Sequence, residues 1–166
     1  MLLGSLALGG VFYLDRCDLY GNVLSRHCAK NGLTTEGLNH ALDVVARQGA
    51  NSTWKIGLID DEGFDAVDAA DTMSSHAGWT EITAYDEATR PLWGPGVITG
   101  KLAVNASYIA FNMNAAKSIK GMFLSSNNTK GGTTGILLCT GIFDDAASML
   151  PAERAKGFYR LSAEGR

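Results

Sequence analysis

The chain has 166 residues, enough for one domain with a sizeable core and too few for two ordinary domains. Hydrophobic residues make up 46% of it and charged residues 19%, a composition that excludes wholesale disorder. The formal net charge of −3 gives no electrostatic footprint for nucleic acid or an anionic membrane, so we expect protein partners and neither of these.

Residues 1–14 form an uncharged stretch at the start of the chain. It lacks the basic residues that open a signal peptide, Gly4, Gly9 and Gly10 interrupt it, and it is too short to span a bilayer. We therefore expect residues 1–10 to form an apolar arm, buried or bound to a partner, ahead of a single domain at residues 11–166.

A β-hairpin is predicted directly after this arm. Its strands are expected at residues 11–18 and 23–28, on either side of a four-residue turn. The turn contains the pair Gly21-Asn22, which readily supplies the positive φ that a tight turn needs. After this hairpin the apolar residues recur with the period of a helix instead of that of a strand.

One short amphipathic helix is predicted near residues 35–47. Thr34 is suited to the N-cap position, and Gly49 is suited to the left-handed position just past the helix end. The apolar residues of this segment recur at i, i+3, i+4 and i+7, which places them on one helix face. These residues are Leu38, Ala41, Leu42 and Val45.

From residue 53 onward the hydrophobic period is twofold, as in β-strands. Trp54, Ile56 and Leu58 point the same way within residues 53–59. Turn-rich segments separate further short runs, at residues 80–85, 96–104, 107–113, 119–125, 135–143 and 157–163. Twenty glycines against three prolines also favour tight turns between short strands. The sequence therefore predicts a mainly β protein, an antiparallel β-sandwich of jelly-roll or immunoglobulin-like type.

The common sequence signatures of catalysis are missing from the chain. It contains no G-x-S-x-G nucleophile elbow, no H-E-x-x-H and no Walker A motif, and the glycine-rich residues 130–135 lack the order of a phosphate-binding loop. Cys17, His27, Cys28 and His40 match no common zinc spacing, and three cysteines without C-x-x-C spacing argue against a disulfide scaffold. We expect no enzymatic activity, no cofactor and no metal.

A series of acidic residues leaves a cation site open as an alternative. Ca²⁺ takes about six to eight oxygen ligands, and a carboxylate-rich loop supplies several of them. However, the EF-hand order is not met, and two of the aspartates are suited to capping a short helical turn at residues 69–75. We expect a solvated loop with local capping, with a bound cation as the alternative. The series consists of Asp60, Asp61, Glu62, Asp65, Asp68 and Asp71.

Two linked motifs stand in the middle of the chain: DTMSSHAGWTE at residues 71–81 and YDEATRP at residues 85–91. NGLTTEGL (31–38), TWKIGLI (53–59) and FLSSNNTKGGT (123–133) flank them in order. Together these segments resemble a group of small virion-associated proteins encoded by tailed phages and prophages. The resemblance covers about residues 10–163, and it brings no catalytic residues with it.

This resemblance implies a virion structural protein that is made in the cytoplasm of a bacterial host. The expected role is capsid decoration: a homo-oligomer on the capsid surface, with the major capsid protein as its partner, that stabilises contacts between capsomers. Two alternatives stay open. One is a component of the tail, tail tip or neck, and the other is a module that binds carbohydrate on the host surface with exposed aromatic side chains.

Eight residues are predicted to contact a partner. Four are leucines of the arm, and three are large aromatic residues between turns, where interface hot spots are common. The eighth, Arg90, is expected to bridge to Glu87 or Glu81 and so hold its loop in place. The alternative for the two tryptophans is a place in the core. The predicted interface residues are Leu2, Leu3, Leu6, Leu8, Trp79, Tyr85, Arg90 and Trp93.

Overall fold

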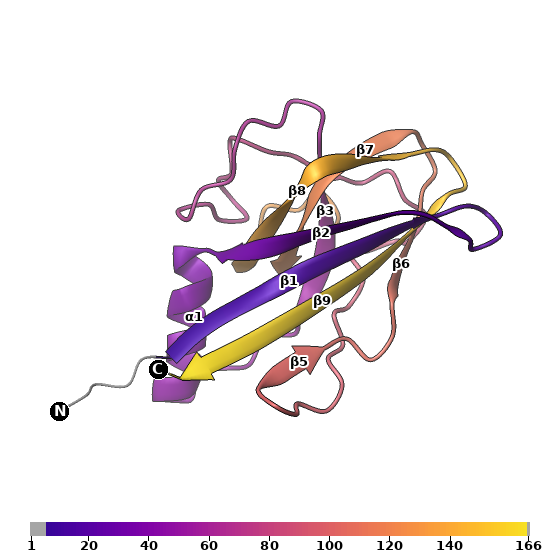
Figure 1. Ribbon diagram of the computed structural model, residues 1–166. Helices are drawn as coiled ribbons and strands as arrows, with labels where there is room; N and C mark the ends of the chain where they lie inside the picture. Colours follow the sequence, from indigo (N-terminus) through magenta and orange to yellow (C-terminus); the bar gives the residue numbers. More distant parts are fainter. Residues whose placement is uncertain (1–5, 166) are drawn as a thin grey trace.

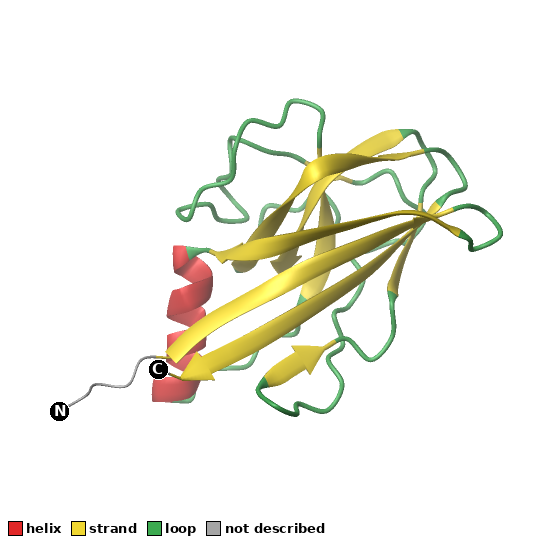
Figure 2. Ribbon diagram, viewed as in Figure 1, coloured by secondary structure: helices red, strands yellow, loops and turns green. Residues whose placement is uncertain are grey.

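The computed structural model describes residues 6–165, which form one antiparallel sheet and one helix (Figures 1 and 2). The strands of this part of the chain follow the order β4-β3-β7-β8-β2-β1-β9-β5, and β6 also pairs with β9. The elements are β1 (Leu6–Cys17), β2 (Val23–Leu33), α1 (Thr35–Arg47), β3 (Lys55–Asp60), β4 (Glu81–Ile82), β5 (Leu102–Val104), β6 (Ile109–Asn112), β7 (Lys117–Ser125), β8 (Leu137–Met149) and β9 (Arg154–Gly165).

The prediction of a mainly β, antiparallel, sandwich-like fold with one helix is confirmed. The sheet is continuous, and its two halves are joined where β2 pairs with β8, from Asn31↔Gly141 to Leu33↔Cys139. One half contains β1, β2, β9, β5 and β6, and the other contains β8, β7, β3 and β4. Within the described residues, the helix is too short to cross a membrane.

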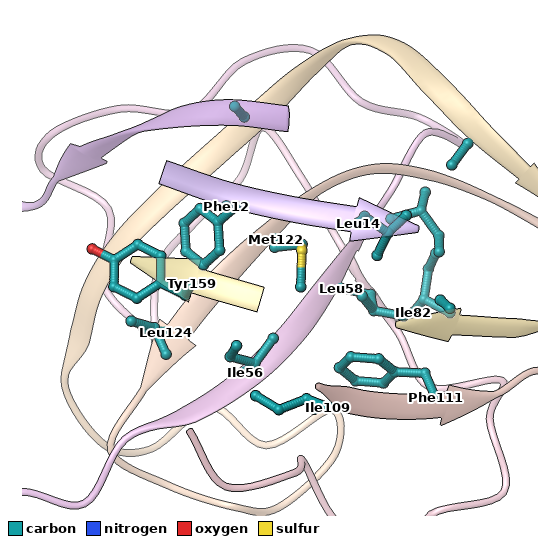
Figure 3. Close-up of a cluster of buried hydrophobic side chains, with 14 of the residues drawn as sticks. Phe12, Leu14, Ile56, Leu58, Ile82, Ile109, Phe111, Met122, Leu124 and Tyr159 are labelled. Atoms are coloured by element: carbon teal, nitrogen blue, oxygen red, sulfur yellow. The ribbon is translucent and has the colours of Figure 1, made fainter. Parts of the chain in front are cut away.

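The main core lies between the two halves of the sheet (Figure 3). Phe12 of β1 packs on Tyr159 of β9, with ring centroids 4.4 Å apart. Ile56 of β3 and Met122 of β7 meet these rings from the other half. Each fully buried side chain of this size contributes about 1.5–3 kcal/mol to folding. A smaller cluster around Trp79 covers the opposite face of β3 and β7 beneath the loop at residues 61–79.

The predicted hairpin is present, and its strands are longer than expected. Gly21 has a φ of 90°, as its turn requires. The carboxylate of Asp18 accepts hydrogen bonds from the backbone N–H groups of Tyr20 (2.9 Å) and Asn22 (2.8 Å), which closes the turn. The side-chain amide of Asn22 also donates to this carboxylate at 2.8 Å and is the largest cause of a lowered pKa for Asp18, and the backbone hydrogen bonds act in the same direction.

The boundary predicted for the N-terminal arm is wrong. Residues 6–10 belong to β1 and pair with β9, from Leu6↔Gly165 to Gly10↔Leu161. Residues 1–5 lie outside the described residues. Deleting residues 1–10 would therefore remove part of β1 together with its pairing to β9, so we expect such a truncation to disrupt the fold.

The helix begins and ends close to the predicted positions. Thr34 is the N-cap, and its hydroxyl oxygen accepts a hydrogen bond from the N–H of Gly37 at 3.0 Å. At the other end Gln48 takes the left-handed conformation that was predicted for Gly49. Gly37 is buried against the backbone of Leu138 in β8, where an added Cβ would overlap the Leu138 carbonyl. This close approach allows α1 to pack directly on the sheet.

A buried polar network ties β2, β8 and β9 together. The amide of Asn31 donates to the Tyr159 hydroxyl at 2.9 Å, and the Cys139 thiol lies 3.5 Å from the same oxygen. Burial raises the pKa of the Cys139 thiol to about 11, against a reference value of 9.0, although these hydrogen bonds act in the opposite direction. Burial also raises the pKa of Tyr159. Both groups are therefore held neutral in the fold.

The raised thiol pKa predicts a loss of stability in base. The unfolded chain releases the Cys139 proton near pH 9 and the folded chain retains it until about pH 11, so this contribution is complete below pH 9 and is lost on passing through pH 11. The difference between a thiol pKa of 9.0 and one of about 11 corresponds to about 3 kcal/mol of unfolding free energy. We expect C139A to lose less unfolding free energy than the wild type between pH 8 and pH 11 in urea titrations. Equal losses of unfolding free energy in C139A and the wild type would contradict this expectation.

Candidate protein-interaction surface

Four of the predicted interface residues lie inside the fold, so that prediction is wrong for them. Trp79, Tyr85, Arg90 and Trp93 are each at most 4% exposed. Packing and internal hydrogen bonds hold them: the Trp79 indole donates to Asp71 at 2.9 Å, and the Trp93 indole donates to a backbone carbonyl at 3.2 Å. The core alternative is the one observed for both tryptophans.

Arg90 is instead the centre of a buried clamp that joins its own loop to β4 and to the loop between β7 and β8. Its Nε and one Nη donate to the two carboxylate oxygens of Glu81, at 2.8 and 2.7 Å. The guanidinium also donates to the backbone carbonyls of Asn127 (3.1 Å) and Gly132 (2.9 Å). The predicted bridge to Glu81 is therefore confirmed, and Glu87 binds Asn112. The most specific sequence motif of the chain thus serves to hold loops together.

The acidic series is also used within the fold. Lys117 binds Asp60 at 2.7 Å and Glu62 at 2.9 Å, and these carboxylates raise the pKa of the lysine. Asp68 accepts a hydrogen bond from the N–H of Ala70, and Asp71 binds the buried indole. The short helical turn predicted at residues 69–75 is wrong, because this segment forms turns and the bridge Thr72↔Ser75 instead. Among residues 6–165, no group of three or more His, Cys, Asp or Glu side chains is arranged to hold a metal ion.

One of the four leucines of the predicted arm lies at an apolar groove on the surface. Leu2 and Leu3 lie outside the described residues, and Leu6 is placed only as part of the β1 backbone. Helix α1 lies beside the adjacent ends of β1 and β9 (Figure 1). Leu8 lines an apolar groove of about 430 Å³ that also includes residues of α1 and β9. A second apolar hollow of about 150 Å³ adjoins this groove, and Leu8, Ile98 and Leu161 line both.

The apolar stripe of α1 adjoins this groove, and its side chains are exposed to solvent. Leu38, Leu42 and Val45 share a helix face as predicted, but they are 44%, 65% and 75% exposed. The side of the helix that bears Gly37 packs against the sheet. The apolar stripe therefore lies on the flank of the helix. Val45 also lines the groove, which makes the two features continuous.

The exposed flank of α1 carries no charge. At 100° per residue, the charged residues of this helix, Glu36, Asp43 and Arg47, fall within one narrow arc on the side opposite the stripe. Contiguous exposed apolar surfaces occur at protein-interaction sites. We call this surface the apolar docking face: Leu38, Leu42 and Val45 of α1, with Leu8, Ile98 and Leu161 of the groove.

Neither a protein-family model nor a curated protein sequence matches the chain. Helical periodicity alone was sufficient to find the stripe. No local signal in the sequence showed that the stripe faces solvent, because its exposure follows from the tertiary contact at Gly37.

Proposed function

We propose that the protein is a non-enzymatic structural component of a tailed-phage particle, and that it decorates the capsid by binding the outer shell through the apolar docking face. Two independent features support this proposal. The motifs at residues 71–91 resemble those of small virion-associated proteins. The exposed, uncharged stripe of α1 that continues into an apolar groove is the observation that carries the docking role.

The energetics of such docking are those of a modest contact repeated many times. Leu38, Leu42 and Val45 would each contribute up to about 1.5–3 kcal/mol on full burial. Association itself costs about 4–15 kcal/mol, so a single contact of this size binds weakly. Many copies on one shell, joined by self-association, make up the difference through multivalency. A protein that binds only the assembled shell stabilises it by mass action.

A co-sedimentation experiment tests the docking role. Particles that lack the protein are separated into shells and tails, and each fraction is mixed with the purified protein and pelleted. We expect saturable binding to shells, at a fixed ratio to the major capsid protein, and none to tails. Binding to tails alone would overturn the capsid proposal in favour of a tail, tail-tip or neck component.

The two tryptophans that could have bound a sugar in the carbohydrate-binding alternative are buried. Trp79 and Trp93 are 2% and 4% exposed, and both indole N–H groups donate to partners inside the fold. Neither ring is free to stack on a sugar. Exposed aromatic side chains do lie elsewhere on the molecule, and one of them, Tyr13, is on the outer face of the sheet.

A further inference from the structure

Strands β2, β1 and β9 present a regular outer face to solvent (Figure 1). Tyr13 of β1 lies directly opposite Phe158 of β9, and both project away from the core. Their chain neighbours Phe12 and Tyr159 point inward and are fully buried, whereas Tyr13 is 38% exposed. The outer face therefore has a paired aromatic platform at its centre.

Basic residues surround this platform. Three cross-strand rows make up the outer face at this point, and we call the nine residues the basic aromatic face. They are Lys30, Val11 and Arg160; Cys28, Tyr13 and Phe158; and Arg26, Asp15 and Lys156. Four of the nine are cations and one is an anion, so this face carries a formal charge of +3 on a chain of net charge −3. Its charge favours an anionic ligand.

The basic aromatic face is hollowed. A depression of about 380 Å³ is lined by Tyr13, Asp15, Arg26, Phe158 and Arg160, among others. Within it, the Arg26 guanidinium lies 3.5 Å from the Asp15 carboxylate, so a hydrogen-bond acceptor and several donors stand beside the rings.

The platform continues towards β6. Tyr108, which is 46% exposed, meets Phe158 edge to face, with ring centroids 6.5 Å apart. The Lys156 ammonium lies 4.8 Å above the Tyr108 ring. The face therefore offers an extended strip of alternating aromatic and cationic groups.

We propose that the basic aromatic face binds an acidic polysaccharide. A sugar ring presents apolar C–H groups that pack on the faces of Tyr13 and Phe158. Its hydroxyl groups donate to the Asp15 carboxylate and accept from Arg26, and its carboxylate groups pair with Arg160. Asp15 favours this ligand over nucleic acid, because its carboxylate accepts hydrogen bonds from the several hydroxyl groups that each sugar ring carries. This binding goes beyond capsid docking and uses a different surface.

The test is binding of the full-length protein to polygalacturonate oligosaccharides by calorimetry, with dextran and oligo(dT) as comparison ligands. We expect binding to polygalacturonate that weakens with salt, and weaker or no binding to dextran and oligo(dT). Y13A should weaken binding about tenfold or more without any change of charge. R160E should also weaken it. Y20A is the matched control, because Tyr20 is 82% exposed in the β1–β2 turn, and it should bind like the wild type.

Thermal unfolding of each variant checks that the fold is kept, and R160E replaces Y13A if the latter does not fold. The proposal is overturned if the wild type does not bind polygalacturonate or if Y13A and Y20A bind equally well. Tighter binding of oligo(dT) than of polygalacturonate would also overturn it, in favour of a single-stranded nucleic-acid site.

Discussion

Replacing Arg90 by methionine is expected to destabilise the fold by about 3–5 kcal/mol, because Glu81 would remain as a buried charge without its partner. The two side chains are 0% and 5% exposed, and the guanidinium makes four hydrogen bonds. A domain has about 5–15 kcal/mol of total stability, so this single change removes a large part of it.

Urea unfolding of R90M, E81Q and the double variant checks this expectation. The double variant should be more stable than R90M, since it no longer buries an unpaired carboxylate. The ion pair between Arg47 and Asp43 is the matched control: its side chains are 82% and 44% exposed, and R47M should change stability by less than about 1 kcal/mol. An R90M protein as stable as R47M would refute the clamp.

Replacing Leu42 by glutamate is expected to weaken shell binding about 100-fold or more. Leu42 lies in the middle of the α1 stripe, and a charge there would have to be buried without a partner in the proposed interface. The fold should be kept, because Leu42 is 65% exposed in the free protein.

The co-sedimentation assay with purified shells measures this effect. Leu19 provides a closely matched control, since it is also 65% exposed but lies in the β1–β2 turn, at the opposite end of the molecule from α1 (Figure 1). L19E should bind shells like the wild type. Equal binding by L42E and L19E would remove the apolar docking face from the mechanism.

Local features of the fold were predictable because local chemistry determines them. Thr34 caps its helix with its own hydroxyl, and Gly21 supplies the positive φ of its turn. Twofold periodicity likewise identified the β class. The extension of β1 to Leu6 was not predictable, because it depends on pairing with residues more than 150 positions later in the chain.

The predicted interface failed for a related physical reason. Trp79 and Arg90 are amphipathic residues typical of interfaces, but here their polar groups find partners inside the fold, Asp71 and Glu81. A motif rich in aromatic and charged residues is therefore compatible with a loop clamp as well as with a binding site. Distinguishing the two requires the burial of each side chain, which depends on tertiary packing.

The copy number of this protein in purified virions tests the decoration proposal most directly. Quantitative mass spectrometry would measure it relative to the major capsid protein. Decoration predicts a ratio near one, or a simple fraction of one, because the binding sites repeat with the shell subunits. A handful of copies per particle would contradict decoration and assign the protein to the tail or neck.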